Sequence, residues 1–263
     1  DPEGSPIGLT LRALWVKTSD RKHDATIAVT LDGRAATALA DRLTLASGDT
    51  VFAPFEQRMT SKGKPYYALR STELLPAGTY RLLFDGKDTG KEVSVGDEAD
   101  VVLLNFYTLE TAFDGNLGGV DTAPLWPVTI DSKEVYLEGS EISLQVRERA
   151  SGYLFDTWTS VDSVAQYADG ATGTSNPTTV VMRGPLTMRA DSKPIDYLVS
   201  FDPNAPDASG EMADQKLSYG FEGKLPANTF ARTGYVFTGW NTAADGTGDA
   251  YADAQNVANL LDS

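Results

Sequence analysis

The side chains that most often perform chemistry are sparse in this sequence of 263 residues. It has no cysteine and a single histidine, His23, which stands between Lys22 and Asp24 in a charged stretch. Nucleophilic catalysis needs a nucleophile with an adjacent base, and zinc sites are built mainly from cysteine and histidine. A lone histidine in a charged loop is more often solvated than catalytic. We therefore expect neither nucleophilic nor zinc chemistry.

Carboxylates are the remaining reactive groups, and they are plentiful. Two loops each gather three oxygen-bearing side chains, Asp245, Asp249 and Asp253 in one and Asp202, Asn204 and Asp207 in the other. Calcium binds such oxygens, but the EF-hand spacing is absent, and Asp and Gly are also the natural residues of tight turns. A glycosidase needs two acids facing one bond, and no local pattern singles out such a pair. We expect turns here, no enzyme and no cofactor or metal, although a loop calcium site stays open.

The overall composition narrows the possible partners. The formal net charge is −15, hydrophobic residues make up 41% of the chain, and the acidic excess grows toward the C-terminus. An acidic surface repels phosphate backbones and anionic lipids, so we expect no nucleic-acid partner. No apolar run reaches membrane-spanning length, so we expect no membrane insertion. Residues 1–6 lack a signal-peptide pattern and are typical of a linker or an expression boundary.

The positioning elements are best seen in a repeated motif, G-Y-x-F-x-x-W, at residues 152–158 and 234–240. Each copy is rich in aromatic and β-branched residues after a glycine, which predicts a strand. The Tyr and Phe share one strand face, whereas the Trp has the opposite parity and reaches the same core only if a bulge intervenes. We expect these rings to anchor two separate small cores rather than an exposed platform for a glycan.

The first hundred residues are patterned as short strands. Residues 9–17 predict a first strand, and Ala25, Ile27, Val29 and Leu31 alternate with smaller polar residues before the turn Asp32-Gly33. Residues 75–79 force another turn, after which Tyr80, Leu82 and Phe84 share a face. Short strands with frequent turn signals favour an all-β sandwich.

Residues 25–33, 75–90 and 93–95 resemble the prealbumin-like, or Cna-B-like, sandwich modules of bacterial surface proteins, over about residues 9–99. Some modules of that kind carry a Lys–Asn isopeptide bond, for which the resemblance implies Lys17 and Asn105 as the plausible partners. The acid that such modules place after the G-T-Y turn is missing, because Arg81 follows. An ordinary exposed lysine is the more common case.

Two further segments resemble repeats of bacterial surface proteins. Residues 136–140, 152–158 and 176–184 are similar to the divergent internalin-B-type repeat, over about 101–193. Residues 199–204, 210–215, 231–248 and 251–253 closely resemble the Listeria–Bacteroides, or internalin B-type, repeat, over 196–263. That resemblance implies a compact β-grasp-like fold with a further closing strand. We therefore expect the last unit to be truncated, leaving one strand as an open edge. Residues 252–261 predict a short helix.

The sequence thus predicts a mainly β protein with three small modules in tandem. We expect a sandwich at 1–99, a divergent repeat at 100–193 and an incomplete Listeria–Bacteroides repeat at 194–263. The implied function is a non-catalytic stalk or adhesive region of a secreted or wall-attached bacterial surface protein, located outside the cell. Its expected partners are a host or cell-surface protein or glycan and the neighbouring repeats of the parent chain.

Two alternatives remain open. One is a carbohydrate-binding accessory module of a larger extracellular enzyme, which needs exposed, coplanar aromatic rings among residues such as Tyr66, Tyr67, Tyr107 and Trp126. The other is a glycosidase with two carboxylates about 5–10 Å apart in a cleft.

Overall fold

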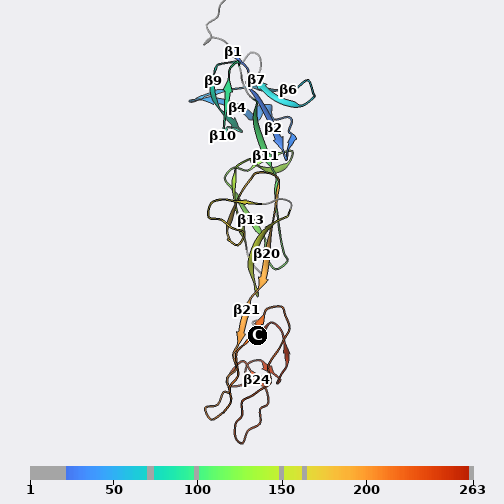
Figure 1. The fold of residues 1–263 in the computed structure, drawn as a ribbon, viewed down its shortest axis with the longest axis vertical. Coiled ribbons are helices and arrows are strands. Elements are labelled where there is room, and N and C mark those ends of the chain that lie inside the picture. Colours follow the sequence, from blue (N-terminus) through green and yellow to red (C-terminus); the bar gives the residue numbers. More distant parts are fainter. Residues whose placement is uncertain (1–21, 70–73, 98–100, 148–150, 162–164, 261–263) are drawn as a thin grey trace, which may run out of the picture. The chain divides into compact units, whose positions relative to one another are not determined.

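The computed structural model describes residues 22–69, 74–97, 101–147, 151–161 and 165–260. The chain forms two compact units, of which the first comprises Asp1–Thr108 and Pro127–Gly139, and the second Leu109–Trp126 and Ser140–Ser263. Nearly every regular element is a strand (Figure 1). The mainly β fold with several separate sheets that the sequence predicts is therefore confirmed.

The first unit contains one sheet of four antiparallel strands. Its order is β10 (Lys87–Val95), β9 (Gly78–Phe84), β4 (Leu43–Ser47) and β5 (Thr50–Phe52). The alternation in β9 buries Tyr80, Leu82 and Phe84 on one face, as the sequence predicts.

A seven-stranded sheet packs against it. The order is β14 (Val128–Ile130), β15 (Lys133–Leu137), β11 (Val102–Tyr107), β2 (Thr26–Leu31), β7 (Pro65–Leu69) and β6 (Phe55–Met59), with β3 (Arg34–Ala35) beside β2. Phe84 of one sheet and Phe106 of the other have ring centroids 4.9 Å apart, so the sheets share a core. The short strands β1 (Lys22–His23) and β8 (Leu75–Pro76) pair separately.

The second unit begins with two small sheets. One has the order β12 (Leu109–Phe113), β20 (Leu186–Pro194) and β17 (Tyr153–Ser160). The other has the order β13 (Val120–Pro124), β16 (Glu141–Val146), β19 (Thr178–Val181) and β18 (Gln166–Tyr167). Leu144, Val180 and Met188 are fully buried, so strands of both sheets contribute to the core.

The first copy of the aromatic motif forms β17, with the bulge that its parity requires. The register against β20 shifts between Phe155 and Thr157. Trp158 is consequently buried, and its ring centroid lies 5.5 Å from that of Phe155. Tyr153 and Phe155 themselves are only half-buried.

The last part of the second unit is held by three strand pairs (Figure 1). These are β21 (Asp196–Val199) with β22 (Gln215–Ser218), β23 (Gly223–Lys224) with β26 (Asn256–Val257), and β24 (Trp240–Asn241) with β25 (Ala250–Tyr251). Its core is small and centres on Leu217, Leu225 and Val257.

Two local expectations are wrong in this last part. Residues 234–239 form no strand, and Tyr235 and Phe237 are 64% and 38% exposed rather than core. No helix spans 252–260, because Ala254 and Asn259 have φ values of 50° and 54°, which a right-handed helix does not allow.

Candidate functional site

The side chains of His23 and Asn105, which the sequence singles out, lie in structural contacts. The Nδ1 atom of His23 is 3.5 Å from a carboxylate oxygen of Asp97, and only 10% of the His23 side chain is exposed. Asn105 accepts a hydrogen bond from the Thr30 hydroxyl at 2.7 Å and donates one to Glu138 at 3.1 Å.

Lys17, the other partner of the implied isopeptide bond, lies outside the described residues. Glu138 is an acid that the sequence comparison with Cna-B-like modules did not find, because it lies in the turn just after β15 rather than on the strand after the G-T-Y turn. The cross-link therefore stays a prediction.

The two aspartate-rich loops form turns. Asp245 accepts hydrogen bonds from the hydroxyl and the backbone N–H of Thr247, and these bonds lower the pKa of Asp245. In the other loop Asp202 accepts from the backbone N–H of Asn204, and Asp207 pairs with Arg232. Within the residues that the structure describes, no three His, Asp or Glu side chains converge as a metal site.

The aromatic residues proposed as a glycan platform differ in exposure. Tyr67 is 1% exposed; its hydroxyl donates to the carbonyl of Ala36 at 2.9 Å and accepts from the N–H of Leu39 at 3.2 Å, and burial raises its pKa. Tyr66, Tyr107 and Trp126 are half-buried. Tyr67 is therefore part of the core, and a platform would have to be built without it.

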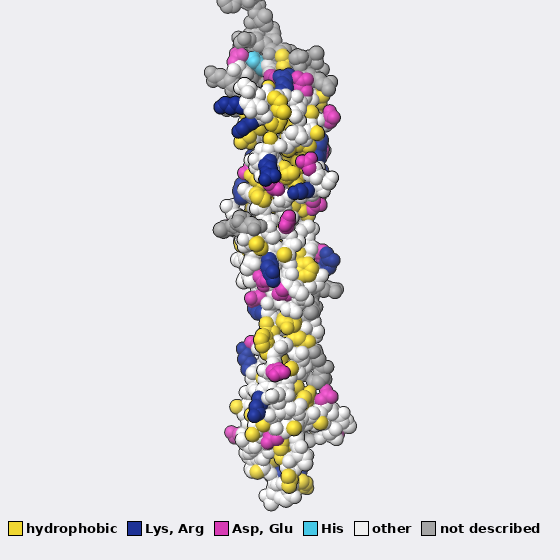
Figure 2. Space-filling model, turned by 90° about the vertical axis from the view of Figure 1, so that its right-hand side faces the viewer, with side chains coloured by type: hydrophobic (Ala, Val, Ile, Leu, Met, Phe, Trp, Pro, Cys, Tyr) yellow, Lys and Arg dark blue, Asp and Glu magenta, His cyan; other side chains and the backbone are white. Residues whose placement is uncertain are grey.

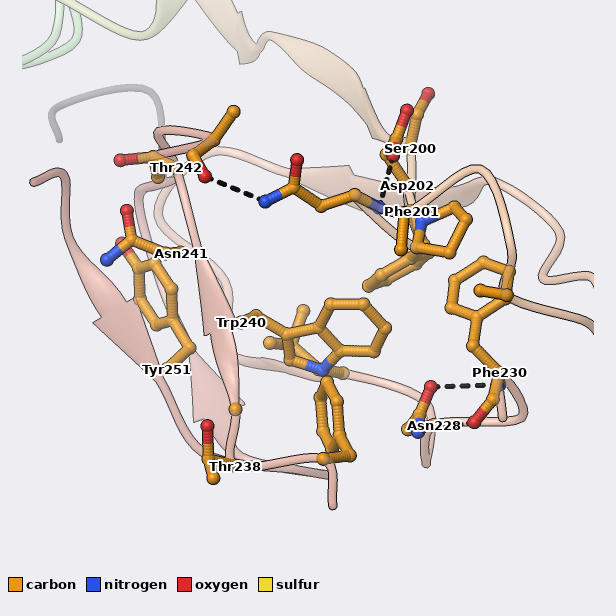
Figure 3. A pocket seen from close by; sticks show the side chains of 18 of the residues that line it. Ser200, Phe201, Asp202, Asn228, Phe230, Thr238, Trp240, Asn241, Thr242 and Tyr251 are labelled. Atoms are coloured by element: carbon orange, nitrogen blue, oxygen red, sulfur yellow. Dashed lines mark hydrogen bonds between the residues drawn. The ribbon is translucent and has the colours of Figure 1, made fainter. Parts of the chain in front are cut away.

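A concavity lies in the last part of the second unit. It is a hollow of about 1170 Å³ between residues 197–205 on one side and 235–244 on the other. Leu225, Phe230 and Tyr251 also line it. Figure 3 shows the indole of Trp240 at its centre, between Phe201 and Tyr251.

Aromatic rings surround Trp240. Its ring centroid lies 5.0 Å from that of Phe201, 6.2 Å from that of Phe230 and 4.7 Å from that of Phe237. At the rim, the guanidinium of Arg232 stacks over the ring of Tyr235 at 3.9 Å. The hollow thus offers apolar and aromatic surface with polar groups at its edge, which is the usual composition of a binding site.

The two motif tryptophans differ in hydrogen bonding. The indole N–H of Trp158 donates to the carbonyl of Ser175 at 3.0 Å. The corresponding N–H of Trp240 is buried without a hydrogen-bond partner. The same motif therefore gives a complete core in the first copy and an incomplete one in the second.

Where the two copies meet, glycines and tyrosines interlock; we call Gly152, Tyr153, Tyr219 and Gly220 the clasp. The two tyrosine rings meet edge to face with centroids 5.5 Å apart. A Cβ at Gly152 would overlap the Tyr219 ring, and one at Gly220 would lie 2.6 Å from the Tyr153 hydroxyl. Both glycines have positive φ, so each position needs glycine for its backbone as well.

The backbone of Ile195 completes the clasp. Its N–H donates to the carbonyl of Gly152 at 2.8 Å, and its carbonyl accepts from the N–H of Tyr219 at 2.9 Å. One residue thus separates the end of β20 from the start of β21 and is hydrogen-bonded on both sides.

Charge is spread over the surface. Figure 2 shows Lys and Arg side chains interspersed with Asp and Glu on the face that it draws. No helix in the described residues is long and apolar enough to span a bilayer.

Comparison with known proteins finds two family matches and a curated relative. Residues 197–260 match the Listeria-Bacteroides repeat domain, and residues 127–195 match the divergent InlB B-repeat domain. Neither match reaches residues 1–126, so the Cna-B-like resemblance there remains a prediction.

The relative is a protein of Evansella cellulosilytica named "Putative Gly-rich membrane protein", 30% identical over 132 residues. The aligned part covers 46% of this chain and 14% of the relative. No solved structure matches the chain. Since both matched families are repeat domains typical of bacterial surface proteins, this chain is a repeat protein in which a divergent InlB B-repeat is followed directly by a Listeria-Bacteroides repeat.

Proposed function

We propose that this chain is a non-catalytic stalk and adhesive region of a secreted or wall-attached bacterial surface protein, located outside the cell. The clasp is the observation that carries the stalk role, since it joins the two repeats through interlocked side chains without a flexible linker. Linkers rich in glycine and serine would instead allow free motion.

The charged side chains support a structural rather than catalytic role. Arg42 pairs with Asp85, Arg232 with Asp207, and Lys216 with Asp196. These side chains are engaged in ion pairs with one another rather than directed into a shared cleft. The resemblance to the two repeat families is what suggests a display or attachment role, with a host protein or glycan as the proposed partner.

The stiffness of the repeat pair can be measured directly. Because the chain has no cysteine, spin labels can be placed at Thr174→Cys and Ala213→Cys, on exposed sites in the two repeats. We expect a narrow distance distribution in the full chain, which becomes broad in Gly152→Val, where the added side chain overlaps Tyr219. Ser151→Ala, next to the clasp, serves as the matched control. A broad distribution in the unaltered chain would contradict the stalk role.

The adhesive part of the proposal needs a separate test. We expect the immobilised chain to bind a member of a panel of host extracellular proteins or glycans. If the chain binds no member of the panel, the adhesive part of the proposal is wrong and only a spacer role is left.

A carbohydrate-binding accessory role is the second candidate, because aromatic rings line the hollow around Trp240. For a sugar to stack in the hollow, it must be able to reach the ring faces of Phe237 and Trp240 from the solvent. We expect any glycan bound in this way to be lost in Phe237→Ala and kept in Tyr66→Ala, whose ring lies in the first unit. Glycan binding that survives Phe237→Ala would exclude the hollow as the sugar site.

A further inference from the structure

The two repeats share more than the G-Y-x-F-x-x-W motif. The sequence Phe-Asp-x-Asn occurs at residues 113–116 and again at 201–204. In both copies the Asp carboxylate accepts a hydrogen bond from the backbone N–H of the Asn, at 2.9 Å in the first copy and 2.6 Å in the second. The strands before these turns, β12 and β21, are therefore equivalent.

In the first copy the strand β20 lies between β12 and β17, the two elements that carry the repeated motifs. β20 pairs in parallel with β12, Phe113 opposite Ala190, and antiparallel with β17, Trp158 opposite Ala190. The side chains of Leu186, Met188 and Ala190 on β20 are buried.

In the second copy the equivalent elements face each other across the hollow. Residues 197–201 line one side and 235–242 the other. In the described part of the chain, β21 pairs only with β22, and β24 only with β25. The hollow therefore lies where the first copy holds β20. Trp240, whose equivalent contacts that strand, has a buried indole N–H without a partner.

We propose that this hollow is a slot for an added β-strand and that residues 9–17 of a second copy of this chain occupy it. Residues 9–13 read Leu-Thr-Leu-Arg-Ala, and residues 186–190 of β20 read Leu-Thr-Met-Arg-Ala. The two stretches differ only in Leu11 against Met188, both apolar. Residues 9–17 lie outside the described residues, and the sequence predicts a strand there.

The match assigns a register to the inserted strand. Leu9, Leu11 and Ala13 take the positions of the buried β20 side chains, with the backbone of Ala13 opposite those of Phe201 and Trp240. A small side chain is required there, because those two rings already approach to 5.0 Å. Addition of a strand to an open edge satisfies backbone groups on both sides and lets the alternate side chains confer specificity.

A polar contact extends the same register. Asp114 accepts a hydrogen bond from the backbone N–H of Ser192 at 2.6 Å. The equivalent pair in the slot is Asp202 with the backbone N–H of Trp15. Asp202 is exposed at the rim of the hollow, where Figure 3 shows it beside Phe201.

The segment that carries the slot and the inserted strand have net charges of opposite sign. Residues 195–263 contain ten acidic side chains, and their basic residues are Lys216, Lys224 and Arg232. Residues 9–17 contain Arg12 and Lys17 and no acid. Attraction between opposite charges favours this encounter and weakens it at high salt.

Such a contact joins different surfaces of the two copies, so it generates open chains or rings rather than a closed dimer. The inference is independent of the surface role proposed above, because it concerns how copies of this chain associate.

Analytical ultracentrifugation of the full chain is the first test. We expect the mean mass to rise with concentration and to fall as salt is added. The double variant Leu11→Asn/Ala13→Asn should stay monomeric, because it places amides where the slot takes apolar side chains. Thr10→Asn, on the opposite strand face, should associate as the unaltered chain does.

Cysteine trapping tests the register. Arg189 lies opposite Ala112 in the first copy, which places Arg12 opposite Ser200 in the slot. We expect a mixture of Arg12→Cys and Ser200→Cys chains to give a disulfide-linked heterodimer on mild oxidation. Arg12→Cys mixed with Ala213→Cys, an exposed site outside the hollow, should give little.

Three results would overturn the proposal. One is a chain that stays monomeric at several hundred micromolar and forms no more heterodimer at Ser200 than at the control site. Another is a disulfide that forms within a single chain carrying both cysteines while the protein remains monomeric. The last is an oligosaccharide that protects Trp240 from modification when the chain does not associate with itself.

Discussion

Two tryptophans in the same motif have different local environments. Trp158 donates its indole N–H to Ser175, whereas the N–H of Trp240 has no partner although it is buried. A buried donor without a partner lowers the stability of the fold. Removing the indole N–H of Trp240 should therefore change the free energy of unfolding little, or raise it.

We expect Trp158→Phe to lower the free energy of unfolding by about 1–3 kcal/mol, because it loses the bond and leaves the Ser175 carbonyl without it. Trp240→Phe is the matched control with the same loss of volume, and we expect a smaller decrease. Urea denaturation of the full chain measures both. Equal losses would show that the indole N–H of Trp158 contributes nothing.

Arg42 and Asp85 form an ion pair in the first unit that is joined by two hydrogen bonds. The Nε atom of Arg42 lies 2.8 Å from a carboxylate oxygen of Asp85, its Nη1 donates to the carbonyl of Thr129 at 2.7 Å, and its guanidinium lies over Phe84. Hydrogen bonds from Arg42 hold the pKa of Asp85 below its usual value.

A carboxylate with a lowered pKa stabilises the fold only while it is charged. We expect the stability lost in Asp85→Asn to be largest above the unfolded-state pKa of about 3.9 and to shrink as the pH falls through the lower folded-state pKa. Urea titrations between neutral pH and pH 2 measure this difference. Asp49→Asn, an exposed loop site, is the control, and a difference that grows toward acid would contradict the assignment.

The bulge in β17 shows how one extra residue controls a whole element. It lies at Asp156, between the two registers against β20, and it brings Trp158 onto the core side with Phe155. Since strand side chains alternate, inserting or deleting one residue moves every later side chain of the strand to the other face.

We therefore expect deletion of Asp156 to destabilise the second unit by about 3 kcal/mol or more, because it turns Trp158 out of the core. Asp156→Asn keeps the bulge and removes only the exposed ion pair with Lys193, so its effect should stay within about 1 kcal/mol. Denaturation monitored by tryptophan fluorescence distinguishes them. A tolerated deletion would mean that the bulge does not set the register.

Strands with clear alternation were predictable from the sequence. β2 and β9 follow the period of two, and the bulge in β17 follows from the parity of its aromatic residues. Residues 234–239 have the same letters but form no strand, because a strand requires a neighbour and the structure places none along that edge among the described residues. The sequence pattern of a single segment does not indicate whether a neighbouring strand is present in the fold.

The hollow was not predictable for a related reason. Phe201 is distant in sequence from Phe230 and Trp240, and the three rings meet only through the fold. The open strand edge expected in this segment comes from the family resemblance and stays a prediction. The fit between residues 9–13 and β20 could be seen only after the structure showed what β20 occupies in the first copy.

The boundaries between the compact units of the chain differ from the boundaries of its family matches. The divergent InlB B-repeat match begins at residue 127, yet Pro127–Gly139 belongs to the first unit. The reason is that β15 pairs with β11, whose other neighbour is β2. The three-module division at residues 99 and 193 remains a prediction about sequence segments.

We expect the two units to unfold in separate transitions, because each has its own core. Leu82→Ala, a fully buried side chain of the first unit, should lower one transition by about 2–5 kcal/mol and leave the other in place. Leu144→Ala in the second unit should do the reverse. Differential scanning calorimetry separates the two, and a single transition shifted by both variants would contradict independent units.

The clasp also limits how repeats of this kind can be recombined. A transplanted repeat must bring a tyrosine that fits over the neighbour's glycine and a glycine that admits the neighbour's tyrosine. Both backbone groups of Ile195 are hydrogen-bonded, so the junction cannot take up an extra residue without losing these bonds. Inserting one residue there would turn the side chains of β21 to the opposite face and separate Tyr153 from Tyr219. Chimeric repeats are therefore viable only when all four clasp residues and the one-residue junction at Ile195 are transferred together.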